Sequence, residues 1–459
     1  MSQIHKVLRR VTSPPAGRWA GIAWLVLMGC GAQAQAARHF PVGTRQVSVP
    51  PVPGVNARLL ASIAPLLEQA IAAGDFPGAV VLAAHRGHVI YRGVFGSRSI
   101  LPAVQPMRFD TIFDLASLTK VVATTPAIMQ LLEQGQIRLD APVTRYWPAF
   151  GAQGKGELTI RQLMTHFSGL APDIPTPDLL KLLHLPATHF PGWPPEQNVD
   201  VPWHGLPAAL QRVEQSQLVN PPGTKFVYSD INFIVLGYLV QRLSGESLDA
   251  YTARHVFQPL GMTATMFNPP ASLRARIAPT EVIDGALRWG TVHDPTAAAM
   301  GGVSGMAGLF SDAHDLGVYA QCLLDGGALP RSSGGRRILG PLTVLKMTTP
   351  QSPLGNPEVR GLGWDIDSSF SNRGVLFSTR SFGHTGWTGT SLWLDPATQS
   401  YVIILTSRVH PTPTPAGNEL IRIRQKVADI VAGSLEDVSI RELGNTGVGE
   451  RQRAFPAKP

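Results

Sequence analysis

Apolar residues near the start of the chain follow first a helical and then a strand pattern. Asn56 is a residue type that favours a helix N-cap, and Gly74 one that favours a helix end. Between them, apolar residues recur at helical spacing: Leu59, Leu60, Ile63, Leu67 and Ile71. Two apolar runs, 79–84 and 89–91, then flank a short polar turn. This part of the sequence therefore predicts a helix followed by a β-hairpin.

The last part of the chain repeats these elements in the opposite order. Residues 391–394 and 401–405 are apolar runs around an Asp-Pro turn and predict a second hairpin. Asn418 favours the cap of a following helix, whose apolar residues share one face: Leu420, Ile423, Val427 and Ile430. We therefore predict that both ends of the chain build one antiparallel sheet flanked by helices, an α/β (α+β) fold.

The middle of the chain has a different composition. Residues 151–300 are rich in Pro and carry short apolar runs separated by loops, which is typical of an inserted helical domain. The predicted boundaries are 38–57 for a Pro-rich linker, 58–150 with 301–432 for the α/β domain, 151–300 for the helical domain and 433–459 for a C-terminal tail.

The N-terminus carries much of the positive charge. The chain has 459 residues, 44% apolar and 15% charged, which is a globular composition, and a formal net charge of +8. Residues 1–37 hold four Lys or Arg and no acidic residue, then an apolar run and Ala-x-Ala sites, which predicts a secretory signal peptide and a periplasmic protein. Cleavage leaves a net charge of +4, and the remaining Arg residues are dispersed, which disfavours nucleic-acid binding.

The two cysteines lie far apart. Leu27-Met28-Gly29-Cys30 resembles a lipoprotein box, so a lipid anchor at Cys30 is the alternative to a soluble periplasmic protein. Cys322 lies in an apolar segment and is predicted to be a small buried residue. Without the leader, Cys322 has no partner for an internal disulfide.

The strongest chemical signal is the pair Ser117 and Lys120. The chain has eight Lys residues, and Ser117 is the only Ser with Lys three positions on. This spacing places both side chains on one helix face, where a desolvated Lys of depressed pKa can take the hydroxyl proton. The alternative is an ordinary helix cap beside a solvated Lys.

Two downstream motifs support the catalytic interpretation. Tyr228-Ser229-Asp230 leads into an apolar helix, and His384-Thr385-Gly386 precedes the second hairpin. In this order, Ser117-x-x-Lys120 and these motifs resemble the S-x-x-K, Y-x-N and K-T-G elements of the penicillin-binding-protein and class C β-lactamase superfamily. Residues 163–170 and 301–311 also resemble segments of that superfamily, and the combination is most similar to type 4B penicillin-binding proteins.

The resemblance implies a role for each matching residue. Ser117 would attack a carbonyl carbon, Lys120 would help to deprotonate it, and Tyr228 would exchange protons with Ser117 and the leaving group. The backbone N–H groups of Ser117 and Trp387 would form the oxyanion hole. The remaining residues would bind substrate: Asp230, His384, Thr385 and Gly386.

Four positions qualify the resemblance. Asp230 replaces the Asn of Y-x-N, so an acceptor stands where the motif has an amide, although Asp also favours a helix cap. His384 replaces the Lys of K-T-G and is a weaker anchor for a substrate carboxylate. Arg380 is close enough in sequence to compensate. Met306 stands where relatives often have His and is predicted to pack in a loop.

Other chemical signatures are absent from the sequence. Walker A, G-x-G-x-x-G, H-E-x-x-H and a complete G-x-S-x-G elbow do not occur, so we expect no cofactor and no metal. The remaining candidates are interpreted as loop or capping residues: His85, His88, His166, His293 and Asp294.

The motifs predict an exported serine hydrolase that forms an acyl-enzyme at Ser117. The resemblance implies action on D-alanyl peptides of peptidoglycan, as a D-Ala-D-Ala carboxypeptidase, and binding of β-lactams. The alternatives are a carboxylesterase or weak β-lactamase on the same core, and a non-catalytic protein that binds cell-wall peptides or β-lactams.

Overall fold

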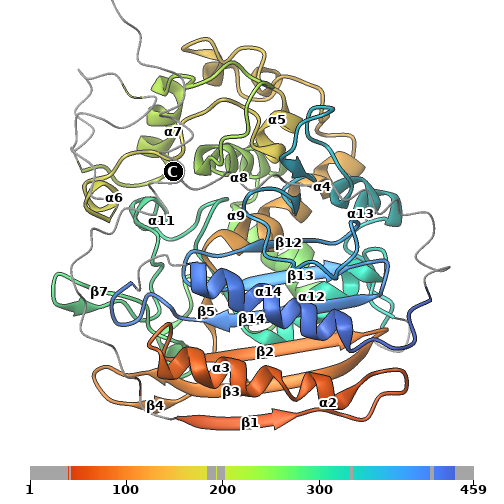
Figure 1. Ribbon diagram of the computed structural model, residues 1–459. Coiled ribbons are helices and arrows are strands. Elements are labelled where there is room, and N and C mark those ends of the chain that lie inside the picture. The colour runs from red at the N-terminus through yellow and green to blue at the C-terminus, as the bar shows by residue number, and fades with distance from the viewer. Residues whose placement is uncertain are drawn as a thin grey trace, which may run out of the picture.

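The main sheet takes its strands from both ends of the chain (Figure 1). The structure, a computed structural model, describes residues 40, 43–182, 193, 202–330, 334–413 and 418–439. The sheet is antiparallel, in the order β1-β3-β2-β14-β13-β12-β11-β10, and β4 pairs with β3. Its strands are β1 (Thr44–Ser48), β2 (Gly78–His85), β3 (His88–Ser99), β4 (Gln105–Pro106), β10 (Val359–Arg360), β11 (Asp365–Asp367), β12 (Phe382–Thr385), β13 (Ser391–Asp395) and β14 (Ser400–Thr406). The predicted antiparallel sheet is confirmed.

The central strand β2 is buried on both faces. Val80 and Leu82 belong to one apolar cluster, whereas Val81 and Ala83 belong to another on the opposite face of the sheet. Successive side chains of a strand point to opposite faces, so a strand covered on both sides is a continuous apolar run. This explains the uninterrupted run that predicted the first hairpin.

Helices from the two chain ends cover one face. They are α2 (Ala57–Leu60), α3 (Ile63–Ala72) and α14 (Asn418–Gly433). Asn56 caps α2 by accepting from the Leu59 N–H, as predicted, although the predicted helix is broken between Leu60 and Ile63. Ile423 and Val427 of α14 are buried in the apolar cluster that also contains Val81 of β2. The predicted cap at Asn418 involves a side chain outside the described residues.

The other face packs against α12 and a helical layer, drawn above the sheet in Figure 1. The remaining helices of the described residues are η1 (Ala116–Leu118), η2 (Lys120–Thr124), α4 (Thr125–Glu133), η3 (Val143–Arg145), η4 (Pro148–Gly151), α5 (Ile160–Thr165), α6 (Pro177–Leu182), α7 (Leu206–Gln215), α8 (Asp230–Ser244), α9 (Leu248–Thr252), η6 (Ala253–Phe257), α10 (Gln258–Leu260), η7 (Ala271–Arg276), α11 (Pro295–Ala299), α12 (Ala313–Leu324) and α13 (Pro341–Thr348). The predicted limits of the helical domain, 151 and 300, stay a prediction.

Two smaller sheets complete the fold. One has the order β5-β9-β6, formed by Phe113–Asp114, Leu309–Ser311 and Met266–Phe267. The other pairs β7 (Val282–Ile283) with β8 (Ala286–Leu287). The first of these sheets joins the segment before Ser117 to the segment after Met306, and it therefore brings two distant motifs together.

Both predicted end segments take part in the fold. Within the predicted linker 38–57, Thr44–Ser48 forms β1 and pairs with β3. The predicted tail begins with docked residues, because the Glu436 N–H donates to the Gly54 carbonyl and Asp437 pairs with His85. Residues 1–37, with Cys30, and 440–459 lie outside the described part of the chain.

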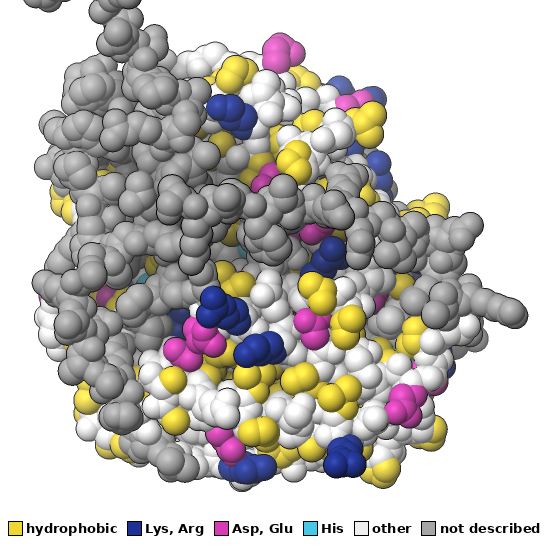
Figure 2. Space-filling model, viewed as in Figure 1, with side chains coloured by type: hydrophobic (Ala, Val, Ile, Leu, Met, Phe, Trp, Pro, Cys, Tyr) yellow, Lys and Arg dark blue, Asp and Glu magenta, His cyan; other side chains and the backbone are white. Residues whose placement is uncertain are grey.

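The described residues bear out two expectations from the sequence, dispersed positive charge and a buried Cys322. On the face in Figure 2, Lys and Arg side chains are scattered and several lie beside acidic ones. Cys322 is fully buried, as predicted, and burial raises the pKa of its thiol to about 12. Across the described residues, no helix combines the length and apolar character needed to cross a membrane.

Candidate active site

Ser117 lies on a strained turn held by a buried carboxylate. Ala116, immediately before it, has a φ of +45°, which is unfavourable for a residue with a Cβ. Asp114 accepts from the backbone N–H of Ala116 (2.8 Å) and of His293 (2.7 Å). These bonds hold the turn, which continues as the 3₁₀ segment η1 and the π-helical segment η2. Ser117 is left half-buried.

Lys120 is completely buried and points at Ser117. Its Nζ donates to Ser117 Oγ (3.0 Å) and to the Met306 carbonyl (2.9 Å), and it lies 2.5 Å from Asp230 Oδ1. The structure therefore confirms that the Ser-x-x-Lys spacing brings the two side chains together. The alternative of a solvated Lys is wrong.

The charge state of Lys120 corrects the sequence prediction. Burial lowers its pKa, but the Asp230 carboxylate and then Tyr228 oppose burial and raise the pKa above its ordinary value of 10.5. The expected depressed pKa is wrong for this arrangement, because the sequence pattern did not place an acidic partner on the amine. Lys120 is an ammonium at neutral pH here.

Tyr228 and Asp230 enter the site from the start of α8. Burial raises the pKa of Tyr228, while the Lys120 charge and hydrogen bonding to Ser117 lower it. Ser229, rather than Asp230, is the N-cap residue of α8. The side chain of Asp230 is instead 21% exposed and pairs with Lys120, so the capping alternative for Asp230 is wrong.

His166 is a site residue that the sequence interpretation missed. It ends α5 in a left-handed conformation, which matches its predicted capping role. Its ring also stacks on Tyr228 with centroids 4.4 Å apart, and its Nδ1 lies 3.1 Å from the Ser229 N–H. The family-like segment 163–170 was the available signal, but it did not specify this contact.

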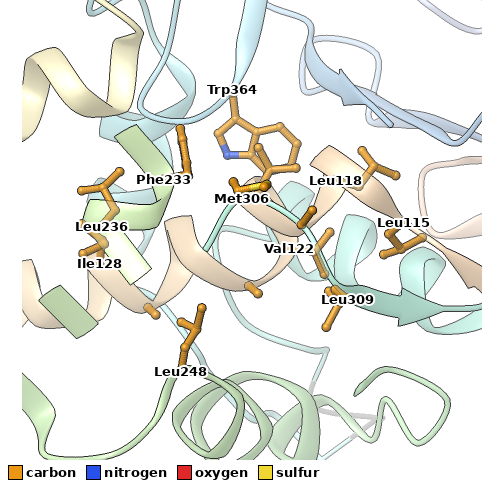
Figure 3. Packing of buried hydrophobic residues seen from close by; sticks show 14 of the residues in the cluster. Leu115, Leu118, Val122, Ile128, Phe233, Leu236, Leu248, Met306, Leu309 and Trp364 are labelled. Atoms are coloured by element: carbon orange, nitrogen blue, oxygen red, sulfur yellow. The ribbon is translucent and has the colours of Figure 1, made fainter. Parts of the chain in front are cut away.

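The glycine-rich loop before β9 supplies the carbonyl that binds Lys120. A Cβ on Gly305 would lie 2.0 Å from the Phe233 carbonyl oxygen, so this loop passes closer to α8 than any side chain permits. The Met306 side chain is buried in the core that also contains Phe233 and Trp364 (Figure 3). The predicted packing role of Met306 is confirmed.

His384 is buried on β12, beside η1. Its ring centroid lies 6.1 Å from that of Tyr228, and its Nδ1 lies 2.8 Å from the Thr385 carbonyl oxygen. Burial, then the charges of Arg360 and Lys120, hold the pKa of His384 well below its usual value. The imidazole is therefore neutral, as the sequence interpretation expected.

The turn after β12 is attached to the segment before Ser117. Thr390 Oγ1 donates to the Leu115 carbonyl (3.0 Å). A Cβ on Gly386 would lie 2.3 Å from the same carbonyl oxygen, so only glycine fits. Trp387 follows Gly386 directly, and this attachment brings its backbone close to the turn that carries Ser117.

Arg380 does not take the role suggested for it. It is exposed just before β12, and its backbone N–H donates to Ser378 Oγ (3.2 Å). No contact within the described residues links its side chain to His384. The structure thus gives no support for Arg380 as a compensating carboxylate anchor.

The other candidate residues have no hydrogen bond to Ser117 or Lys120 among the described residues. Asp294 caps α11 by accepting from the Ala297 N–H (2.8 Å), as predicted, whereas His88 is the exposed first residue of β3 rather than a loop residue. His293 bonds Glu281 through its ring (2.8 Å). His85 is a buried residue of β2 rather than a loop residue.

One group of described side chains has the spacing of a metal site. It consists of Asp312, His314 and Asp315 near the start of α12. Asp312 caps this helix, and Asp315 accepts from the Ala264 N–H (2.7 Å). Both carboxylates therefore have structural roles.

Comparison with known proteins identifies related chains. A family model described as Beta-lactamase matches residues 63–426. The chain is 30% identical over 429 residues to a protein of Escherichia coli O157:H7 named "Putative D-alanyl-D-alanine carboxypeptidase", covering 86% of this chain and 92% of that protein. A relative of the same name from Salmonella schwarzengrund is 31% identical, covering 83% and 90%.

Solved structures share the fold. A penicillin-binding protein homologue from Caulobacter crescentus matches with a TM-score of 0.62 and 21% identity, covering 84% of this chain and all 100% of that one. EstCE1, a hydrolase with promiscuous acyltransferase activity, matches with a TM-score of 0.61 and 24% identity, covering 81% and 99%. These matches confirm the predicted fold.

Proposed function

Because the chain belongs to the beta-lactamase family of serine hydrolases, we propose that it forms an acyl-enzyme at Ser117 and hydrolyses D-alanyl peptides of peptidoglycan. The 3.0 Å contact between Lys120 Nζ and Ser117 Oγ is the observation that carries this proposal. A serine hydroxyl is a weak nucleophile until a neighbouring group accepts its proton. The carboxypeptidase names of the curated relatives support the peptide class.

The proposed acylation uses the residues around this contact. In the fraction of the protein whose Lys120 amine has lost its proton, Ser117 Oγ bonds to the substrate carbonyl carbon and its proton passes to Lys120. The backbone N–H groups of Ser117 and Trp387 stabilise the oxyanion. The bond to the leaving amine then breaks, the amine takes a proton from Tyr228, and Lys120 returns a proton to the phenol oxygen. Water then attacks the carbonyl carbon of the ester. The bond to Ser117 Oγ breaks, and the proton that the water loses restores the serine hydroxyl.

Export belongs to the same proposal. Residues 1–37 would direct the chain to the periplasm, where peptidoglycan peptides and β-lactams are encountered, and Cys30 is the site of a lipid anchor in the alternative. Cell fractionation with and without residues 1–37, together with mass measurement of the mature N-terminus, tests export and separates the two forms.

A carboxylesterase is the second candidate, and His384 favours it. A buried neutral imidazole provides no positive charge for a free substrate carboxylate. The buried contact of Lys120 with Ser117 argues against a non-catalytic binding protein. Burying a Lys amine costs free energy, and a protein that only binds its ligand does not require an amine beside the serine hydroxyl.

The test compares the wild type with Ser117→Ala, using Ser272→Ala at an exposed position as the matched control. Each protein is incubated with fluorescent penicillin, a nitrophenyl ester and a D-Ala-D-Ala peptide. We expect covalent labelling or turnover in the wild type and control and none in Ser117→Ala. Turnover that persists in Ser117→Ala would refute the assignment of Ser117 as the nucleophile. A wild type without labelling or turnover would favour a binding protein.

A further inference from the structure

Arg408 holds the turn that follows β12, and the sequence interpretation did not single it out. This residue lies just after β14, and only 7% of it is exposed. Its Nε donates to the Trp387 carbonyl (2.7 Å), and its guanidinium carbon lies 4.6 Å from the centroid of the Trp387 indole. Its backbone N–H also donates to the Thr388 carbonyl (2.9 Å). Arg408 therefore contacts both the backbone and the side chain of Trp387.

The other side of this turn is tied to the segment before Ser117. The buried Thr388 donates from Oγ1 to the Asp114 carbonyl (2.7 Å). This bond runs beside the one that Thr390 donates to the same segment. These two hydroxyl bonds set how far the turn lies from Ser117. The contacts of Arg408 instead orient the residue just before Thr388.

A second buried cation lies on the same turn. Arg424 of α14 is buried, and its Nη2 donates to the Thr390 carbonyl (3.0 Å). Burial, and then the charge of Arg408, lower the pKa of Arg424, so the two guanidinium groups repel each other. A neutral donor would satisfy a carbonyl at lower cost, because a buried charge loses its hydration. Two positive charges beside this turn stabilise negative charge near it, and acyl transfer develops such charge on the carbonyl oxygen.

We propose that Arg408 is a positioning residue of the oxyanion hole, which fixes Trp387 so that its backbone N–H points at the oxygen that becomes negative. A donor lowers the barrier most when it is in place before the reaction begins. Because the carbonyl and the indole of Trp387 are both held, its Cα and the adjoining N–H cannot rotate freely. This inference rests on the proposed function and deepens it, since it assigns a further residue to the same site.

The test changes the one substrate atom that an oxyanion hole binds. The substrates are para-nitrophenyl acetate and its thionoester, in which sulfur replaces the carbonyl oxygen. Sulfur is larger and a weaker acceptor, so hydrolysis of the thionoester depends less on the hole. In Arg408→Met, which lacks the charge and the donor, we expect kcat for the ester to fall about tenfold with little change in KM. The thionoester should lose less than about twofold, so the ratio of the two kcat values falls.

Arg58→Met is the matched control, because Arg58 is exposed on α2, and its ratio should equal that of the wild type. Equal losses for the two substrates in Arg408→Met, or no loss, would overturn the inference, since a purely structural role affects both reactions alike. Melting curves verify folding. If Arg408→Met does not fold, Arg408→Lys replaces it under the same criterion, because Lys keeps the charge but lacks the planar donor.

Failure of the proposed function gives a different result. A wild type that neither hydrolyses the ester nor is labelled by fluorescent penicillin at Ser117 would refute the acyl-enzyme, and the role of Arg408 with it. If the wild type is labelled but leaves the ester intact, the labelling rate becomes the readout, because attack on the lactam carbonyl also develops an oxyanion. We then expect Arg408→Met to be labelled about tenfold more slowly, and an equal rate would overturn the inference.

Discussion

The imidazole of His166 lies against the phenol ring of Tyr228, with centroids 4.4 Å and planes 25° apart. His166 Nδ1 faces two donors, the Ser229 N–H and the Asn232 side-chain amide, each at 3.1 Å. A nitrogen that accepts from donors carries no proton, and burial keeps the pKa of His166 well below its usual value. This neutral ring therefore fixes both the backbone after Tyr228 and the plane of the phenol.

The substitution His166→Asn tests the stacking contact. Asn tolerates the left-handed φ of +61° and retains an acceptor, but it has no ring. We expect a loss of about tenfold in kcat with little change in KM, because a misplaced Tyr228 affects proton transfer more than binding. Ester hydrolysis at several substrate concentrations measures both constants.

His166→Phe is the complementary variant, since it keeps a ring but removes the acceptor. The Ser229 N–H would then be buried without a partner, and we expect the free energy of unfolding to fall by about 1–3 kcal/mol. Urea unfolding measures this change. Equal kcat for the wild type and His166→Asn would contradict a positioning role for the stack.

The pair Lys120 and Asp230 predicts a pH dependence. Asp230 raises the pKa of Lys120 against the effect of burial, so the amine of the wild type stays charged at neutral pH. In Asp230→Asn burial dominates, the pKa falls, and more Lys120 is available as a base. We expect the rising limb of kcat/KM against pH for a neutral ester to move to lower pH.

Asp140→Asn is the control for this experiment, because the Asp140 side chain is 67% exposed and lies away from Lys120. Its profile from about pH 6 to 10, a range that brackets the ordinary and lowered pKa of a Lys amine, should match that of the wild type. An unshifted limb in Asp230→Asn would mean that Lys120 is not the group whose deprotonation limits the rate.

The central strands of the sheet could be predicted because each is a short run of apolar residues in the sequence. Residues 79–84 and 401–405 are apolar at every position, since both faces of β2 and β14 are covered. The edge strand β1 was missed because Thr44–Ser48 is mostly exposed and has no apolar run. Its pairing with β3 depends on a partner that its own sequence does not specify.

The site was predictable only where chemistry depends on sequence spacing. Ser117 and Lys120 are three residues apart, so helical geometry alone brings them together. Asp230 reaches Lys120 across the fold, and Met306 contributes a backbone carbonyl, which every residue type has. No motif records either contact, so the raised pKa of Lys120 could not be inferred from the sequence.

The close contact of Gly305 with α8 predicts a specific sensitivity. In Gly305→Ala, the new Cβ would collide with the Phe233 carbonyl, and the loop would have to move the Met306 carbonyl away from Lys120. We expect the free energy of unfolding to fall by about 1–3 kcal/mol, together with a lower kcat. Urea unfolding and ester kinetics measure the two effects.

Gly301→Ala is the matched control in the same loop. Gly301 has a φ of +92°, but a Cβ added there would meet no atom within 4 Å, so its substitution costs only backbone strain of about 1 kcal/mol. Its kcat should remain that of the wild type. Equal effects of the two substitutions would show that the short distance to α8 does not explain the sensitivity of position 305.

Asp294 predicts how stability depends on pH. Burial, then the charge of Asp230, raises the pKa of its carboxyl from 3.8 to about 6. Between these values the folded protein binds a proton that the unfolded chain has lost, so this stabilisation is present at low pH and disappears as pH rises through the folded-state pKa. We expect Asp294 to make the wild type about 1–2 kcal/mol less stable at about pH 8 than at about pH 5.

The substitution Asp294→Asn tests this titration. Asn keeps an N-cap for α11 but cannot ionise, so the variant should be the more stable protein on the alkaline side of the transition. Urea unfolding at both pH values measures the difference, with Asp140→Asn as the exposed control. Parallel curves of stability against pH for Asp294→Asn and the wild type would refute the buried acid as the cause, because only the wild type carries a carboxyl group at this position.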